Sequence, residues 1–535
     1  MHQSKIHTSM APRQRAGSAR AAPRASEEAP RKESSTHGTI YKPTTSHPLG
    51  PTSRSQSRSA VNGSEPTPPT ALRSAKRKHA NDEDRAATRS VKKPKVGPGK
   101  ADAVPQRNRH GVETPASASL PIINPASTGV LAVLVFGNGD AGELGLGPAI
   151  HEAGRPRLNP FLDPVNPSAL HCYLGVNDNC ALGRNTAWDG GLRDIDGDSD
   201  QDDGELNPLE STPTPIPASA FLPGTRFTQV AAGDSCSFAV TDTGLVYGWG
   251  TFKDSSGNET FGYDASGQVI VKQTTPTRIH GLSNITQVAC GANHAIALDV
   301  NGVVWSWGCS EQNQLGRRVF GRHATDSFTP DPVHIRDVKH IASGDYHSLA
   351  VDGKGRVWAW GLNSFGEAGY AKAAGGNEVL LPFPMKIPGL RGKGVVCLAG
   401  GSHHSAAVMA DGQCFVWGRL DGGQLGVSFS PEQLQDKSPI CHDERNKPQI
   451  CLRPTAVPGI GKVSHVACGT DHTIFVTRKG TAYATGFNSQ GQLGLGGEDD
   501  IEVAQLIKGK ALKDRVATWA GAGGQFSVIA ARSDP

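Results

Sequence analysis

The sequence of 535 residues contains no long hydrophobic run and no closely spaced pair of cysteines. Its longest apolar run, residues 130–136, falls far short of the ~20 residues that a membrane-spanning helix needs, so we expect no membrane association. Ten cysteines are scattered without any C-x-x-C pair, which argues against a zinc module and against a disulfide framework. We therefore expect no metal, no other cofactor and a reducing, intracellular environment.

The net positive charge is confined to the first 120 residues. That segment holds 22 Lys and Arg against 9 Asp and Glu, and because the whole chain carries +4, the remaining 415 residues carry a net charge of −9. The segment is rich in Pro, Ser, Thr and Ala and cannot bury enough apolar surface to offset the entropy lost on ordering. We predict that residues 1–120 form a disordered basic tail, of the kind that meets nucleic acid, acidic proteins or import receptors.

Two basic clusters in the tail are separated by a 13-residue spacer. This spacing resembles a bipartite nuclear import signal, so we predict a nuclear protein that binds an import receptor. The tail is also expected to bind DNA phosphates without sequence preference. The residues of the predicted signal are Lys76, Arg77, Lys78, Lys92, Lys93 and Lys95.

Glycine accounts for 65 of the 535 residues, well above the average share of about 7%. Many of these glycines recur at fixed places in an internal repeat. The first half of the repeat reads V-A-x-G-x-x-H-x-x-A-L, and the second half reads G-x-V-x-x-W-G-x-x-x-x-G-x-L-G. Both halves alternate apolar with small or polar residues, as strands do, so each unit predicts about four strands, the size of a propeller blade. The repeated glycines fall at Gly233, Gly291, Gly344, Gly401, Gly469 and Gly524 in the first halves, and at Gly137, Gly175, Gly250, Gly308, Gly361, Gly418 and Gly486 in the second halves.

The order of the halves predicts a closed ring. The body starts with a second half and ends with a first half, so the terminal strands complete one blade and leave no open sheet edge. We predict an all-β, seven-bladed propeller over residues 121–535. The step from Gly137 to Gly175 is only 38 residues and carries no first half, so the second blade is expected to be incomplete.

An acidic segment, residues 189–212, interrupts the repeats. Five of its carboxylates fall at calcium-loop positions, but Ser199 stands where such a loop needs glycine, and no amphipathic helices flank it. We expect a disordered acidic insert and no calcium site. The five residues are Asp194, Asp196, Asp198, Asp202 and Glu205.

The combination of the two halves, repeated six or seven times over about residues 125–535, resembles the regulator of chromosome condensation family. The basic tail, the half blade at the start and an irregular third blade resemble its members that exchange guanine nucleotide on the GTPase Ran. The resemblance implies a seven-bladed propeller that associates with histones and DNA and catalyses no covalent chemistry. The alternative is a non-catalytic propeller scaffold for protein or chromatin binding.

The irregular third blade carries a polar insertion after Trp249-Gly250. From the residues alone this is either a tolerated surface loop or a functional projection. The resemblance favours a projecting hairpin over about residues 251–262 that presses on the GTPase near its phosphate-binding loop. The wedge is assigned to Thr251, Phe252, Lys253, Asp254, Ser255, Ser256 and Gly257.

A second candidate set lies between the repeated Gly and His, where the residue pairs differ from unit to unit and should line one rim of the ring. The His residues themselves recur in register and are expected to be buried ties between strands. The resemblance assigns the GTPase contacts to Asp140, Asp234, Asn293, Arg317, His403 and Phe526. Two of these depart from the family, because Asn293 replaces a carboxylate and Phe526 replaces a late His. The resemblance also implies a histone contact through a loop arginine, in the region of Arg317, Arg318 and Arg322.

Overall fold

The computed structural model describes residues 120–125, 129–162, 180–188, 206–264, 266–319, 326–376 and 379–533. The predicted tail up to residue 119, with all six residues of the import signal, lies outside these ranges. So does Arg322.

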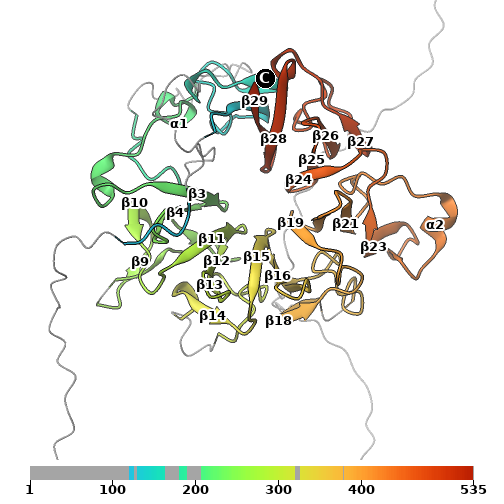
Figure 1. Cartoon of the computed structure of the whole chain (residues 1–535), viewed down its shortest axis with the longest axis horizontal. Helices are drawn as coiled ribbons and strands as arrows, with labels where there is room; N and C mark the ends of the chain where they lie inside the picture. The colour runs from blue at the N-terminus through green and yellow to red at the C-terminus, as the bar shows by residue number, and fades with distance from the viewer. Residues whose placement is uncertain are drawn as a thin grey trace, which may run out of the picture. The chain divides into compact units, whose positions relative to one another are not determined.

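Six antiparallel sheets are arranged around a common centre (Figure 1), and each consists of four strands or, in one case, five. The inner strands, which contact one another around the centre, are β3 (Phe227–Ala232), β11 (Ile285–Cys290), β15 (Val338–Ser343), β19 (Val395–Gly400), β24 (Val463–Cys468) and β28 (Arg515–Ala522). The second strands are β4 (Cys236–Thr241), β12 (His294–Asp299), β16 (His347–Asp352), β20 (His404–Met409), β25 (His472–Thr477) and β29 (Phe526–Ser533).

The third strands end at the repeated Trp-Gly positions and are β5 (Val246–Gly250), β13 (Val304–Gly308), β17 (Val357–Leu362), β21 (Cys414–Arg419), β26 (Ala482–Gly486) and β1 (Ala132–Asn138). The outer strands are β10 (Gln273–Arg278), β14 (Asp331–Val333), β18 (Leu380–Lys386), β23 (Pro448–Ala456), β27 (Ile501–Leu506) and β2 (Glu152–Leu158), and β22 (Ile440–His442) adds a fifth strand beside β23. The all-β propeller prediction is confirmed.

Helices are few and short in the described part of the chain. They are α1 (Pro208–Ser211), α2 (Pro431–Gln435) and the 3-10 turns Pro160–Leu162, Ala218–Ala220, 326–328 and Lys510–Leu512. None of the helices described could cross a membrane.

The ring closes as predicted, in a sheet that joins the two ends of the body in the order β2-β1-β29-β28. Leu134 of β1 pairs with Ile529 of β29, and Gly137 pairs with Phe526. Leu134 and Ile529 are fully buried in one apolar cluster with residues of the preceding blade. A hydrophobic core that spans the closure stabilises the ring at the point where the chain is discontinuous.

The repeated His residues tie neighbouring blades together, as expected. All four are fully buried, and each ring Nε2 lies within hydrogen-bond distance of a hydroxyl in the next blade. The pairs are His294 with Ser348 (2.9 Å), His347 with Ser405 (2.7 Å), His404 with Thr473 (2.9 Å) and His472 with Ser527 (2.8 Å). Because each tie spans two blades, the set links five sheets in series.

The sector that follows the closing sheet is described only in its last loop, residues 180–188. The backbone carbonyl of Ala181 accepts hydrogen bonds from Trp249 Nε1 (2.6 Å) and from the Ser237 hydroxyl (2.7 Å). The carbonyl of Gln314 receives the same pair of bonds from Trp360 and Ser348 two blades further on. The Ala181 loop therefore contacts the β3–β10 sheet as the Gln314 loop contacts the β15–β18 sheet, as expected for the last loop of a second-blade unit. Residues 163–179 lie outside the described part.

One prediction is wrong in part. Residues 189–205 of the acidic insert lie outside the described part, but residues 206–212 are ordered around α1. The Asn207 side chain accepts a hydrogen bond from Leu209 N–H and caps this helix, with Pro208 in its first turn. A cap followed by proline is a helix-start signal, and it outweighed the polar composition here.

Candidate functional site

The Gly-x-x-His turns and the loops after Trp-Gly lie on the same face of the propeller. First and third strands of an antiparallel sheet run in the same direction, so the turns that end them share one face. We call it the loop face. It carries both candidate sets, the variable pairs and the insertion in the third blade.

The turns after the inner strands are joined by a chain of five hydrogen bonds around the centre of the loop face, a region that we call the mouth. Each turn accepts a backbone N–H from the turn before it: Asp234 to Ala292 (3.0 Å), Ala292 to Asp345 (3.1 Å), Asp345 to Gly401 (3.2 Å), Ser402 to Thr470 (3.3 Å) and Thr470 to Gly523 (3.2 Å). The approach is so close that a Cβ on the repeated glycine would overlap the next turn's carbonyl. The variable side chains are therefore held in fixed positions around the mouth.

Acidic groups dominate this mouth. Asp234 is exposed and accepts no hydrogen bond from any residue that the structure describes, whereas Asp345 is half-buried and accepts one from the Ser402 hydroxyl. The surrounding protein raises the pKa of Asp234 to about 6, with a further contribution from the Asp345 charge and an opposing one from Lys253. Burial also raises the pKa of Asp345. Because Asp234 is solvent-accessible, water screens part of its shift. The site favours a positively charged group as its ligand.

His403 lies at the mouth within a small polar and aromatic cluster. Its Nδ1 is 3.5 Å from the buried carboxylate of Glu367, and its ring centroid is 4.6 Å from that of Phe365. Arg419 also lies over the Phe365 ring, 5.3 Å from its centroid, and its Nη1 is 3.6 Å from Asp471. His403 is only partly buried and remains available on the loop face.

The third-blade insertion forms a hairpin. Strand β6 (Phe252–Lys253) pairs with β7 (Glu259–Thr260), and the Asp254 carboxylate closes the turn by accepting the N–H groups of Ser256 (2.9 Å) and Asn258 (2.8 Å). Phe252 anchors the base, fully buried against Phe238. A buried aromatic base and a self-bonded turn give the hairpin a defined shape.

A second hairpin follows directly, and the sequence analysis missed it. Strand β8 (Gly262–Tyr263) pairs with β9 (Val269–Ile270), and Asp264 closes its turn by accepting the N–H groups of Ser266 (2.8 Å) and Gln268 (2.9 Å). The sequence held a signal, because D-S-S-G-N at 254–258 recurs as D-A-S-G-Q at 264–268. The insertion is thus a pair of hairpins.

Two predicted contact residues are placed differently from the expectation. Arg317 is buried, and its guanidinium donates to the backbone carbonyls of Ser306, Asp326 and Thr329 at 3.2 Å each. These hydrogen bonds hold the Arg317 side chain inside the blade, so its guanidinium does not lie at the rim of the ring. Its neighbour Arg318 is exposed.

Phe526 occupies the position of the repeated His in the last blade. It pairs with Gly137 as His294 pairs with Gly308, and a Cβ on Gly523 would overlap its ring, as one on Gly291 would overlap His294. The repeated glycine of this blade is therefore Gly523 rather than Gly524, and the sequence register was wrong by one residue. The variable pair at this point of the mouth is Gly524-Gln525.

The remaining candidates are on the loop face. Asp140 is exposed, accepts a hydrogen bond from Asn138 Nδ2 (2.8 Å) and lies 3.8 Å from His151. Asn293 accepts the backbone N–H of Lys253 (2.7 Å), so it contacts the first hairpin directly. In the described part of the chain no three His, Cys, Asp or Glu side chains are grouped as metal ligands.

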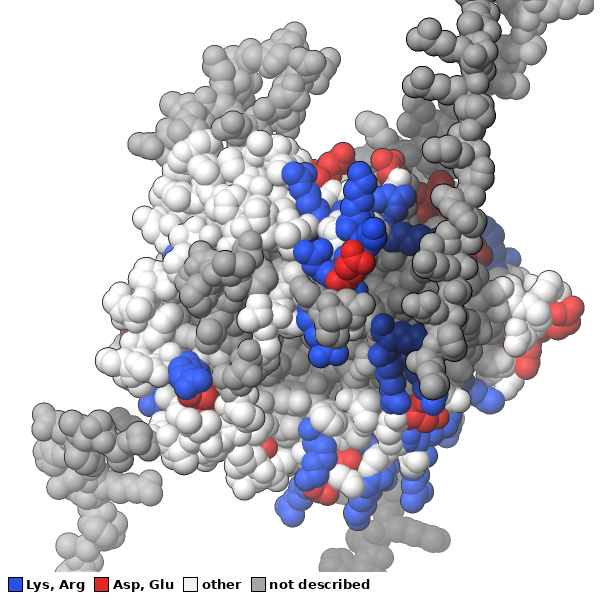
Figure 2. Space-filling view, turned by 45° about the horizontal axis from the view of Figure 1, so that its top comes forward, with Lys and Arg blue, Asp and Glu red and all other residues white. Residues whose placement is uncertain are grey.

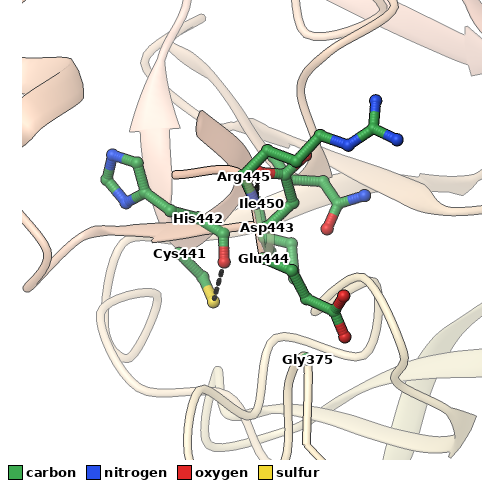
Figure 3. A pocket seen from close by; sticks show the side chains of 8 residues that line it. Gly375, Cys441, His442, Asp443, Glu444, Arg445 and Ile450 are labelled. Atoms are coloured by element: carbon green, nitrogen blue, oxygen red, sulfur yellow. Dashed lines mark hydrogen bonds between the residues drawn. The ribbon is translucent and has the colours of Figure 1, made fainter. Parts of the chain in front are cut away.

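A separate hollow of about 410 Å³ lies on the outer edge, between the loop at Gly375 and the β22–β23 hairpin. Its lining includes Cys441, Glu444 and Arg445, and the Glu444 side chain extends on the side of Gly375 while Arg445 extends the other way (Figure 3). None of the predicted site residues lines this hollow.

These features define a closed β-propeller with an elaborated loop face. A family model, the RCC1-like domain, matches residues 132–529. The guanine nucleotide exchange factor SRM1 of Saccharomyces cerevisiae is 37% identical over 432 residues, which cover 74% of this chain and 86% of that protein. The chain therefore belongs to the regulator of chromosome condensation (RCC1) family.

Two solved structures are similar over most of the propeller. Prp20p from Saccharomyces cerevisiae, described with its binding properties to Gsp1p and histones, is 34% identical with a TM-score of 0.68, covering 76% of this chain and 93% of that one. Yeast RCC1 (Prp20) bound to Kap60 is 33% identical with a TM-score of 0.69, covering 80% and 96%. The name of SRM1 agrees with the expectation of an exchange factor that carries out no covalent chemistry.

Proposed function

We propose that this protein is a guanine nucleotide exchange factor for the small GTPase Ran. The observation that carries the proposal is the first hairpin, residues 252–260, which stands preformed on the loop face and is bonded to Asn293 at the mouth. A rigid projection beside an acidic mouth suits a partner whose nucleotide site must be opened. Membership of the RCC1 family supports the same function.

The exchange mechanism is differential binding. The loop face binds nucleotide-free Ran more tightly than the loaded form, and by linkage it weakens the hold on the nucleotide by the same factor. The hairpin displaces the phosphate-binding segment, and the carboxylates of Asp234 and Asp345 stabilise a positive group of Ran at the mouth. No covalent bond is made or broken in either protein.

The structure supports a revised set of contacts. Asp140, Asp234, Asn293 and His403 lie on the loop face, whereas Arg317 is committed to the interior. The amide of Asn293 uses its oxygen as an acceptor for the Lys253 N–H, a role that needs no charge. The missing carboxylate at position 293 is therefore compatible with exchange. Thr251 and Phe252 are fully buried at the base of the first hairpin, so of the predicted wedge residues we retain only Lys253 to Gly257 as the projecting part.

We further propose that the protein acts in the nucleus on chromatin, with an import receptor, histones and DNA as partners. The relatives described with histones and bound to Kap60 support this proposal, as does the basic tail with its two clusters. Lys and Arg side chains also gather in the centre and right half of the described surface in Figure 2. Such local positive charge suits a phosphate backbone even though the body is acidic overall.

A pull-down with nucleotide-free Ran, followed by release of a fluorescent guanine nucleotide, tests the proposal. We expect retention of Ran, loss of binding when nucleotide is added, and acceleration of release by the full chain. Histone binding without retention of nucleotide-free Ran would favour the scaffold alternative.

A further inference from the structure

The tip of the first hairpin is bonded to the loop of the next blade. Ser255 donates its backbone N–H to Glu311 Oε2 (2.8 Å) and its hydroxyl to Glu311 Oε1 (2.7 Å). Both oxygens of one carboxylate are thus used by one residue that lies 56 positions away in sequence. Hydrogen bonds to an ionised acceptor are about twice as strong as neutral ones.

The first strand of the hairpin has two further bonds to the same blade. Lys253 donates its N–H to Asn293 (2.7 Å) and accepts a hydrogen bond from the Cys309 thiol (3.3 Å) on its carbonyl. Asn293, Cys309 and Glu311 all belong to the β11–β14 blade. The first hairpin, an insertion in the third blade, is therefore hydrogen-bonded to the next blade.

The second hairpin shows what the turn does without such a bond. Its Asp264 makes the same turn as Asp254, but among the described residues the bonds of that turn are all internal to it. The turn alone therefore does not fix a hairpin against a neighbouring blade. The added element in the first hairpin is Glu311.

Two pairs of residues are too few to fix the direction of an isolated hairpin in water. The cross-blade bonds therefore set the angle at which the tip leaves the loop face. We propose that Glu311 is a positioning residue, which holds Ser255 and with it the wedge tip in the orientation that nucleotide release requires. This inference rests on the proposed exchange function. Glu311 is exposed and outside the buried core, so its role is distinct from holding the ring together.

The test compares Glu311→Ala, Glu311→Gln and Ser255→Asp with the wild type. Alanine removes both acceptors, glutamine keeps one oxygen acceptor, and aspartate at 255 places a second negative charge against Glu311. We expect the maximal rate of nucleotide release from Ran to fall by about three- to tenfold in Glu311→Ala, by less in Glu311→Gln and by at least as much in Ser255→Asp. The concentration for half-maximal rate should change little.

Hydrogen exchange at the Ser255 amide provides a readout that does not involve Ran. We expect this amide to be protected in the wild type and to exchange faster in Glu311→Ala, with the unfolding midpoint unchanged. Glu502→Ala, an exposed glutamate on β27 of another blade, is the matched control and should change neither measurement.

The result separates this inference from the exchange function itself. A tip variant in which two glycines replace residues 254–258 serves as reference. If the tip variant slows release and Glu311→Ala does not, the positioning role is overturned and the exchange function stands. If the tip variant also releases at the wild-type rate, the wedge and positioning roles both fail although exchange stands; if the wild-type protein does not accelerate release, the proposed function fails. Unchanged protection of the Ser255 amide in Glu311→Ala would likewise overturn the positioning role.

Discussion

Two adjacent layers of the loop face occupy neighbouring positions in the four blades from β11 to β27 and differ in chemistry. The lower layer consists of identical, fully buried residues that bond to the next blade: His294, His347, His404 and His472. The upper layer lies one residue earlier and consists of four different, partly exposed residues: Asn293, Tyr346, His403 and Asp471. In this molecule repetition marks the parts that hold the ring, and variation marks the surface open to a partner.

The largest expected effect is on the lower layer as a whole. Burial lowers the pKa of His294 to about 3 and that of His347 to about 4. The unfolded chain, with a His pKa near 6.5, binds protons that the folded ring excludes. Stability is therefore fully present above pH 6.5 and falls below it, by up to about 1.4 kcal/mol per pH unit for each His. We expect the urea midpoint to fall steeply from pH 7 to pH 5; a constant midpoint would contradict neutral, buried His.

A smaller effect separates two neighbours of the same turn. His404→Ala removes a buried tie to Thr473 and leaves a cavity, so we expect a loss of about 3 kcal/mol in the free energy of unfolding. His403→Ala should cost less than about 1 kcal/mol because its side chain is partly exposed. Equilibrium denaturation of both variants measures this. Equal losses would break the distinction between the two layers.

The variants His403→Ala and His404→Ala should rank in the opposite order in their effect on the rate of nucleotide exchange. We expect His403→Ala to slow nucleotide release from Ran by about three- to tenfold, as expected for an interface residue outside the centre. Folded His404→Ala, assayed well below its unfolding temperature, should release at nearly the wild-type rate. A slower His404→Ala than His403→Ala would contradict the proposal for the upper layer.

The smallest effect concerns the charge of Asp234. Its pKa of about 6 means that the carboxylate ionises between pH 5 and 7, so wild-type exchange should rise over this range. Asp234→Asn should show a flat pH profile of exchange, at a rate about threefold lower at pH 7.

The effect of Asp234 on the free energy of unfolding has the opposite pH dependence. Its folded pKa lies above the free value of 3.8, so its contribution to stability is lost as the pH rises through 6. Asp234→Asn is therefore expected to be slightly more stable than the wild type at pH 7. Parallel pH profiles for both proteins would rule out this role.

Most of the ring was predictable because its constraints are local and repeated. The glycines allow turns to approach within hydrogen-bond distance, the alternating halves define strands, and the order of the halves predicts closure of β1 on β29. The buried His followed from the same repetition. These features depend on spacing, which a sequence displays directly.

The parts that failed depend on contacts outside the repeat. Arg317 is buried because four backbone carbonyls accept its guanidinium, three of them from residues 326–329, which lie outside the repeated pattern. Phe526 was assigned to the wrong position because the segment G-A-G-G offers two glycines for one role. The bond between Ser255 and Glu311 joins the third-blade insertion to a variable position of the next repeat, so spacing could not reveal it.

The central claim is that the tip at 254–258 opens a G protein while the ring beneath it holds the tip and the binding residues of the loop face in place. The most direct test is stopped-flow release of fluorescent GDP from Ran with the tip variant. Its matched control carries two glycines in place of residues 443–447, a turn on another blade that is closed by Asp443 in the same manner. The account predicts at least a tenfold slower release for the tip variant, wild-type release for the control and equal unfolding midpoints. Wild-type release by a folded tip variant would contradict it.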